Sequence, residues 1–74
     1  MYQIINVLPE DKNNLKGTIL NVLFLQEGEK MVADVPSIHQ KLVTSPVVTI
    51  TENFSENIIK VKTKHTTYML KKVN

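Results

Sequence analysis

The last quarter of the chain alternates apolar and polar residues in two runs that fit one another. Residues 58–72 read IIKVKTKHTTYMLKK. If a turn centres on Lys64 and His65, the two runs form an antiparallel β-hairpin with one apolar and one basic face. The apolar face then holds Ile59, Val61, Tyr68 and Leu70, and the other face holds Lys60, Lys62, Met69 and Lys71. The turn residues are not of the Asn-Gly type, so a loop of two or of four residues both agree with this register.

The first half of the chain also consists of apolar runs that are separated by proline, glycine and loop residues. Residues 2–8, YQIINVL, are rich in β-forming side chains and stop at a proline, and residues 9–17 read as a loop that ends on a glycine. Residues 18–26 and 30–38 are two further apolar runs, separated by a turn around Gly28. We expect a strand, a loop and then a second hairpin.

Residues 18–26 also fit a helix. Ile19, Val22 and Leu23 have helical spacing, with Thr18 as an N-cap and Gly28 as a stop. The β-branched and aromatic content favours a strand, and the helix remains the alternative.

Residues 37–43, SIHQKLV, are the one segment for which a helix is favoured. Ser37 and Gln40 have the spacing of a capping box, in which each side chain caps the backbone of the other. Residues 44–46, TSP, would end this helix after at most two turns, because proline restricts the residue before it.

The remaining strands are expected at 47–53, 57–64 and 66–73. The pattern predicts a mainly β protein, a small barrel or half-open antiparallel sheet of five to six short strands with at most one short helix. We expect residues 1–74 to form a single domain, similar in size to an SH3 domain. A core this thin gives marginal stability, and a chain without cysteine has no disulfide to add, so a homo-oligomer is one expected source of extra stability.

Charge is divided unevenly along the chain. Residues 1–57 carry four lysines and seven acids, a net of −3, whereas residues 58–74 carry five lysines and no acid, a net of +5. A basic strip attracts phosphate through counterion release, which makes nucleic acid a candidate partner. The residues that would contact it are Lys60, Lys62, Lys64, Lys71 and Lys72.

Three observations oppose a nucleic-acid surface. The chain has no arginine, so the bidentate fork for guanine edges and phosphates is missing. The aromatics are two tyrosines and two phenylalanines, and the hairpin register places Tyr68 in the core rather than on the basic face. Lysines on an outer strand also prevent edge-to-edge pairing of sheets, which is the favoured interpretation.

Catalytic and ligand signatures are missing. His39 and His65 have no serine, cysteine or carboxylate at a spacing that suggests a partner, so no enzyme is expected. Neither Gly17 nor Gly28 belongs to a phosphate-binding loop, and we expect no metal, cofactor or small-molecule substrate. The longest apolar run, 19–25, is too short to span a bilayer and the start does not resemble a signal peptide, so we expect a cytoplasmic protein without a membrane partner.

The run ILNVLFL at 19–25 is apolar on both faces if it forms a strand. One small sheet usually buries only one of its faces. Leu20, Val22 and Phe24 would then form a surface for a second copy or for a protein partner. The alternative is a strand enclosed within a small barrel or covered by the 37–43 helix.

Two segments, VTSPVVTI at 43–50 and IIKVKTKHTTYML at 58–70, resemble the carboxyl ends of short uncharacterised proteins of phages and other mobile elements of low-GC Gram-positive bacteria. The resemblance implies a context in which small proteins bind and modulate a host or defence protein, or bind nucleic acid. From the sequence we expect a non-catalytic accessory factor that binds and modulates a protein partner. A low-specificity nucleic-acid-binding module is the alternative.

Overall fold

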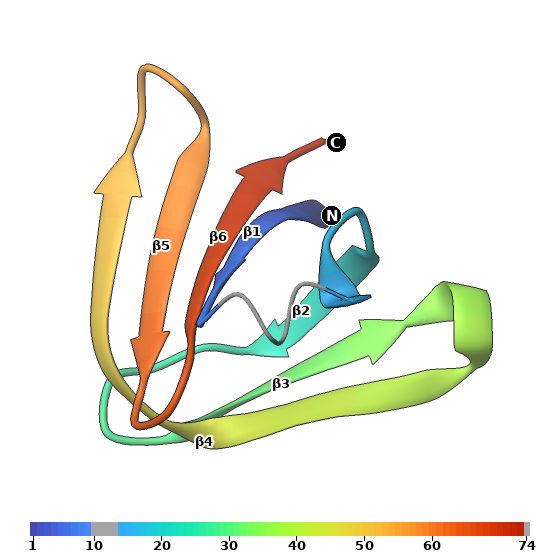
Figure 1. The fold of residues 1–74 in the computed structure, drawn as a ribbon, viewed down its shortest axis with the longest axis horizontal. Helices are drawn as coiled ribbons and strands as arrows, with labels where there is room; N and C mark the ends of the chain where they lie inside the picture. Colours follow the sequence, from blue (N-terminus) through green and yellow to red (C-terminus); the bar gives the residue numbers. More distant parts are fainter. Residues whose placement is uncertain (10–13, 74) are drawn as a thin grey trace.

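The structure, a computed structural model, describes residues 1–9 and 14–73 and folds them into a closed antiparallel barrel of six strands (Figure 1). The elements in chain order are β1 Tyr2–Leu8, β2 Ile19–Phe24, β3 Lys30–Val35, the 3-10 turn η2 Pro36–Ile38, β4 Gln40–Asn53, β5 Ile58–Thr63 and β6 Thr67–Lys72. Consecutive strands pair, and β1 closes the barrel against β6. The predicted mainly β barrel is confirmed, in its closed form.

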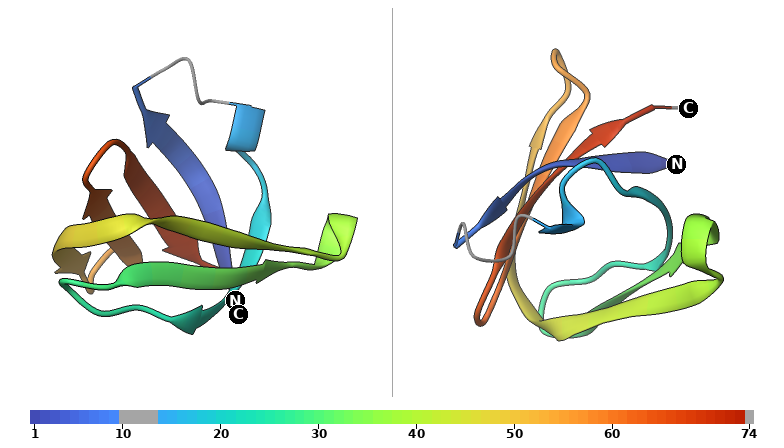
Figure 2. Two further views of the ribbon diagram at one scale, coloured as in Figure 1. Left: turned by 90° about the horizontal axis from the view of Figure 1, so that it is seen from below. Right: turned by 45° about the vertical axis from the view of Figure 1, so that its right-hand side comes forward.

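The longest strand, β4, joins the two halves of the barrel, as the views in Figures 1 and 2 show. Its first half pairs with β3 as far as Pro46, and its second half pairs with β5 from Val47 onward. The register shifts on both sides of this point, and such irregularities bend and twist a strand. Pro46, which has no N–H to give to a ladder, lies where the strand changes partner.

The helix predicted over 37–43 is wrong. Only Pro36–Ile38 form a 3-10 turn, which ends at His39 in the left-handed region with φ 53°. The capping box does not form, because the N-cap is Val35 and no side chain caps the turn. From Gln40 onward the chain gains ladder hydrogen bonds with β3, and residues 44–46, expected to end a helix, lie inside β4. The described part of the chain holds no helix that is long and apolar enough to cross a membrane.

Within residues 18–26 a strand forms, as favoured, over Ile19–Phe24, and the helical alternative is wrong. β2 pairs antiparallel with β3 around Gly28, whose φ of 90° suits a residue without a side chain. The N–H of Gly28 donates to the carbonyl of Val47 at 2.8 Å, and the N–H of Val47 donates to the carbonyl of Glu29 at 2.9 Å. These bonds tie the β2–β3 turn to the bend in β4.

The carboxyl-terminal hairpin has the register that the sequence predicts. Val61 pairs with Tyr68 and Lys60 with Met69, which centres the turn on residues 64–65. The N–H of Thr63 donates to the carbonyl of Thr66 at 2.7 Å, and the Thr63 hydroxyl accepts from the N–H of Thr66 at 3.1 Å. The Thr63 hydroxyl also donates to the carbonyl of Thr66 at 2.8 Å. These three hydrogen bonds between Thr63 and Thr66 close the turn without an Asn-Gly pair.

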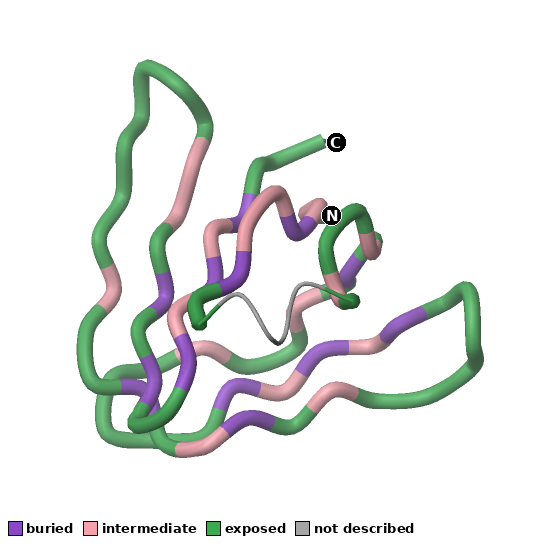
Figure 3. Tube along the Cα trace, in the orientation of Figure 1, coloured by how far each residue is buried: buried purple, intermediate pink, exposed green. Residues whose placement is uncertain are grey.

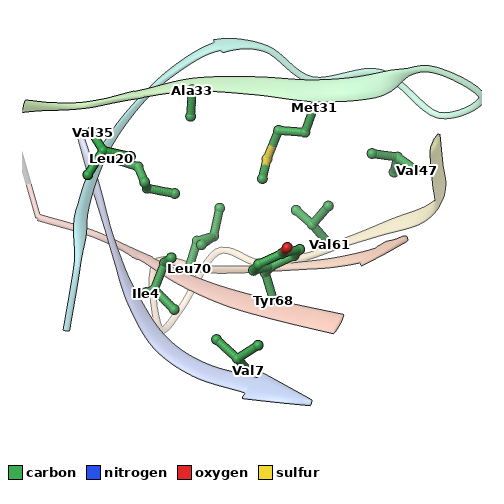
Figure 4. Packing of buried hydrophobic residues seen from close by; sticks show 10 residues of the cluster. All are labelled: Ile4, Val7, Leu20, Met31, Ala33, Val35, Val47, Val61, Tyr68 and Leu70. Atoms are coloured by element: carbon green, nitrogen blue, oxygen red, sulfur yellow. The ribbon is translucent and has the colours of Figure 1, made fainter. Parts of the chain in front are cut away.

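The core fills the barrel interior with side chains from all six strands (Figures 3 and 4). Its buried members are Ile4, Val7, Leu20, Met31, Ala33, Val35, Val47, Val61, Tyr68 and Leu70. Three threonines, Thr44, Thr63 and Thr66, are also buried. The hydroxyl of Thr44 accepts a hydrogen bond from the N–H of Met31 at 3.1 Å. The Thr44 hydroxyl therefore satisfies a donor of β3 where the β3–β4 register shifts.

Candidate functional site

One side of the barrel carries a basic surface that spans four neighbouring strands. Lys60 and Lys62 lie on the outer face of β5, and Lys71 lies on the outer face of β6. Lys60 has Thr51 of β4 beside it on one side and Met69 of β6 on the other. We call this surface the lysine face; it consists of Lys60, Lys62, Lys71, Met69, Thr49, Thr51, Thr67 and Gln3.

No described acid lies on the lysine face. Glu52 pairs with Ile59 and therefore points to the opposite side of the sheet from Lys60. Asp34 belongs to β3 and is 4.0 Å from Lys41 in an exposed ion pair. Glu29 and Glu56 lie in turns, outside the strands of the face. Glu27 lies in the β2–β3 turn, but its carboxylate accepts a hydrogen bond from the N–H of Ile50 in β4 at 2.9 Å, at the edge of the lysine face. The three lysines, all exposed, form no ion pair with a described acid, and Glu27 is the acid held at the edge of their surface.

The other two lysines of the hairpin lie at its two ends, as the register predicts. Lys64 is in the turn and lines a shallow hollow together with Lys62 and His65. Lys72 pairs with Tyr2 and faces the same way as Tyr68, toward the mouth of the barrel. The five predicted contact residues are thus one surface of three lysines with one lysine beyond each end.

A hollow near Lys72 was missed by the sequence analysis. It lies between the start of β1, the end of β6 and the β4–β5 hairpin, whose tip extends beyond the barrel in Figure 1. Tyr2 and Phe54 are among its lining residues, and Phe54 is 82% exposed. The sequence signal for this site was Phe54, a phenylalanine in a turn between two strands, where no core exists to bury its side chain. We call this site the aromatic hollow, lined by Tyr2, Phe54, Asn57, Ile59, Glu52 and Lys72, with Asn53 and Ile58 completing its rim.

The predicted partner surface of Leu20, Val22 and Phe24 does not exist as one face. Leu20 is fully buried in the core, and Val22 is half-buried and packs against it. The register of β2 shifts between Val22 and Phe24, and an extra residue in a strand reverses the side on which the following side chains lie. Phe24 therefore lies on the outer face, 45% exposed, while Leu20 is unavailable to a partner. The alternative of a strand enclosed in the barrel holds for Leu20.

Phe24 joins two valines on the outside of the barrel. It pairs with Val32 of β3, which in turn pairs with Val43 of β4, so the three side chains lie side by side across three strands. Val43 is 55% exposed. We call these three residues the apolar row; it is the exposed counterpart of the surface that the sequence predicted on β2 alone.

Neither histidine belongs to the lysine face, the aromatic hollow or the apolar row, although His65 lines the shallow hollow beside Lys62. His39 is exposed at the end of η2, and His65 is exposed in the β5–β6 turn. Within residues 1–9 and 14–73, no three histidine or acidic side chains gather in a group that could hold a metal ion.

Comparisons with protein-family models, with curated proteins and with solved structures found no match for this chain. The lysine face, the aromatic hollow and the apolar row are therefore interpreted from their own chemistry.

Proposed function

We propose that this chain is a small non-catalytic protein that binds nucleic acid on the lysine face. The observation that supports this best is the set of three exposed lysines on adjoining strands that form no ion pair with a described acid. Threonines and a glutamine fill the rest of the face, and their hydroxyl and amide groups suit contacts with phosphate and sugar. A face without arginine fits binding of low sequence specificity.

The strength of such binding follows from the number of lysines. Three lysine–phosphate contacts predict a slope of log affinity against log salt of about −2 for a single strand, and nearer −3 for a duplex. Between about 50 mM and about 200 mM salt, a single strand would lose roughly 20-fold in affinity. The interaction is therefore weak at high salt and measurable at low salt.

The experiment is a fluorescence-anisotropy titration of labelled single- and double-stranded DNA and RNA at these two salt concentrations. In the test variant, Lys60→Glu is combined with Lys62→Glu, which removes two of the three lysines and adds two repulsive charges. In the matched control, Lys30→Glu is combined with Lys41→Glu, which changes the net charge equally, from +2 to −2, away from the lysine face.

We expect the test variant to lose salt-sensitive binding and the control to keep most of it. Both variants change exposed side chains, so circular dichroism should show the same folded spectrum for each. Equal losses in the two variants would mean that overall charge, and not the lysine face, governs binding. No binding of any oligonucleotide at low salt would refute the proposal.

A protein partner is the second candidate, favoured by the apolar row. Phe24 and Val43 expose about half of their surface on the outside of a folded barrel, next to the polar pair of Asp34 and Lys41. An apolar centre with a polar rim is the usual composition of a protein interface. In this case the partner would be a host or defence protein and the chain an accessory factor of a mobile element, or the partner would be a second copy. Sedimentation over a range of concentrations tests the second copy, because a strict monomer refutes it.

The sequence favoured a protein partner over nucleic acid, and we propose the reverse order because of where the residues lie. Of the three residues expected to form the partner surface, only Phe24 faces outward. All three lysines assigned to one face of the hairpin do lie together.

A further inference from the structure

The size and the lining of the aromatic hollow suit the binding of a nucleobase better than the binding of a phosphate group. Its volume is about 160 Å³, well below the range of about 300 to 1,000 Å³ that is usual for drug-sized ligands, so it accommodates a single ring system at most. Tyr2 and Phe54 supply aromatic surface, and the half-buried side chain of Ile59 supplies an apolar floor. Aromatic side chains that are exposed beside a basic groove are the usual stacking surfaces for unpaired bases.

The polar groups of the hollow are free to bind a ligand. Among the described residues, the side chains of Asn57, Glu52 and Lys72 form no hydrogen bond or ion pair with one another or with any other side chain. By contrast, the amide of Asn53 at the rim is already used, because it donates to Glu56 at 2.7 Å and accepts from Ser55 at 2.8 Å. An amide and a carboxylate are the groups that read base edges, where the carboxylate accepts from an exocyclic amino group.

Charge distinguishes the hollow from the lysine face. Glu52 and Lys72 both line the hollow and together give it no net charge, so an anion gains little by entering it. The lysine face, in contrast, carries three lysines and no described acid. A ligand that places neutral rings in the hollow and negative charges on the lysine face matches both environments, and a single-stranded nucleic acid has this composition.

The two sites lie on opposite sides of one sheet and meet at its end, because Glu52, Ile59 and Lys72 of the hollow point away from the side that carries the three lysines. The outer face ends at the pair of Ile58 and Lys71, and Ile58 is at the same time on the rim of the hollow. Lys72, the residue after Lys71, lines the hollow itself. A nucleic-acid strand whose phosphates follow β5 from Lys62 toward Ile58 therefore has to turn over this end of the sheet to place a base in the hollow.

We propose that the aromatic hollow receives one base of a single-stranded nucleic acid whose phosphates lie on the lysine face. This inference rests on the proposed function, and it adds a preference for single strands over duplexes. A base held in a duplex has both faces stacked and its edge paired, so it cannot enter the hollow without being extruded.

The test is a titration of labelled single-stranded and duplex oligonucleotides at low salt with the variant Phe54→Ala. Phe54 is 82% exposed in a turn, so its truncation leaves the barrel intact. The loss of one stacked base predicts a fall in single-strand affinity of about 5- to 150-fold. The salt slope should stay unchanged, because no lysine is removed, and duplex binding should stay unchanged as well. Ile38→Ala, which truncates a 56% exposed side chain on η2, is the control and should leave both affinities unchanged.

A second arm uses an oligonucleotide with the same phosphates but without bases. The unmodified protein should bind this abasic strand about as weakly as Phe54→Ala binds the strand with bases. If the unmodified protein binds single strands in a salt-sensitive way, yet Phe54→Ala and the abasic strand cause no loss, the base-binding hollow is refuted and the lysine face stands. If no oligonucleotide binds at low salt, both proposals are refuted, and a protein ligand is left for the hollow.

Discussion

Leu20 and Leu23 lie three residues apart on one strand, and the structure gives them opposite roles. Leu20 is 0% exposed inside the barrel, whereas Leu23, at the register shift of β2, is 50% exposed. Replacing Leu20 with alanine removes three buried carbon atoms and leaves a cavity, which costs about 3 to 5 kcal/mol of unfolding free energy. A single core of this size supplies no more than roughly 3 to 5 kcal/mol in total, so Leu20→Ala should be largely unfolded at 25 °C.

The assay is urea denaturation followed by circular dichroism, with Leu23→Ala as the matched control. Leu23→Ala removes the same atoms from a half-exposed site and should cost less than about 1 kcal/mol. Leu20→Val removes only one methylene, so this variant should stay folded and its urea midpoint can be measured. It should cost about 1 kcal/mol and lower the urea midpoint by about 1 M, at a denaturant slope of about 1 kcal/mol/M. Equal midpoints for Leu20→Ala and Leu23→Ala would refute the assignment of Leu20 to the interior, and with it our division of the predicted partner surface.

Two further predictions concern polar groups in the core. Thr44→Val keeps the shape of the side chain but leaves the buried N–H of Met31 without an acceptor, which should cost about 1 to 3 kcal/mol in urea denaturation; Thr44→Ser keeps the hydroxyl and should cost less, and an equal loss in both would contradict this role. Burial raises the pKa of Tyr68 above its ordinary value of 10.0, and a hydrogen bond with the Thr66 side chain partly offsets the rise. Because the neutral phenol is favoured in the folded state, this stability is present below about pH 10 and is lost as the pH rises through the raised pKa. The unfolding free energy should therefore fall less steeply above about pH 10 in Tyr68→Phe than in the unmodified protein, and identical slopes would refute the role of Tyr68.

The carboxyl-terminal hairpin shows how much of this fold the sequence contained. Its register, the core position of Tyr68 and the shared face of Lys60, Lys62 and Lys71 all follow from alternation over fifteen consecutive residues. Strand β1 was predicted at its observed bounds, because its apolar run ends at a proline. In both cases the information is local, since each side chain is placed relative to neighbours only a few residues away.

The helix predicted over 37–43 failed because the signals that favoured it were also local. A capping-box spacing and two apolar residues four apart are local signals, and they compete with pairing between β3 and β4, which involves residues on both sides of the turn. Once Val35 pairs with Gln40, the segment gains a ladder of hydrogen bonds along its length, and the helix signal is overridden. The chain between the strands then needs only the turn at Pro36–Ile38.

The sequence by itself determined which residues alternate, which runs outside residues 37–46 form strands, and which lysines share a face of the last hairpin. Tertiary structure alone decided that Phe24 lies outside the barrel while Leu20 lies inside, because a register shift against β3 reverses the alternation of β2. It also decided that Tyr2 and Phe54, which are far apart in the chain, line one hollow. The physical reason is that alternation fixes side chains only relative to their own strand, whereas bulges and barrel closure depend on contacts between distant segments.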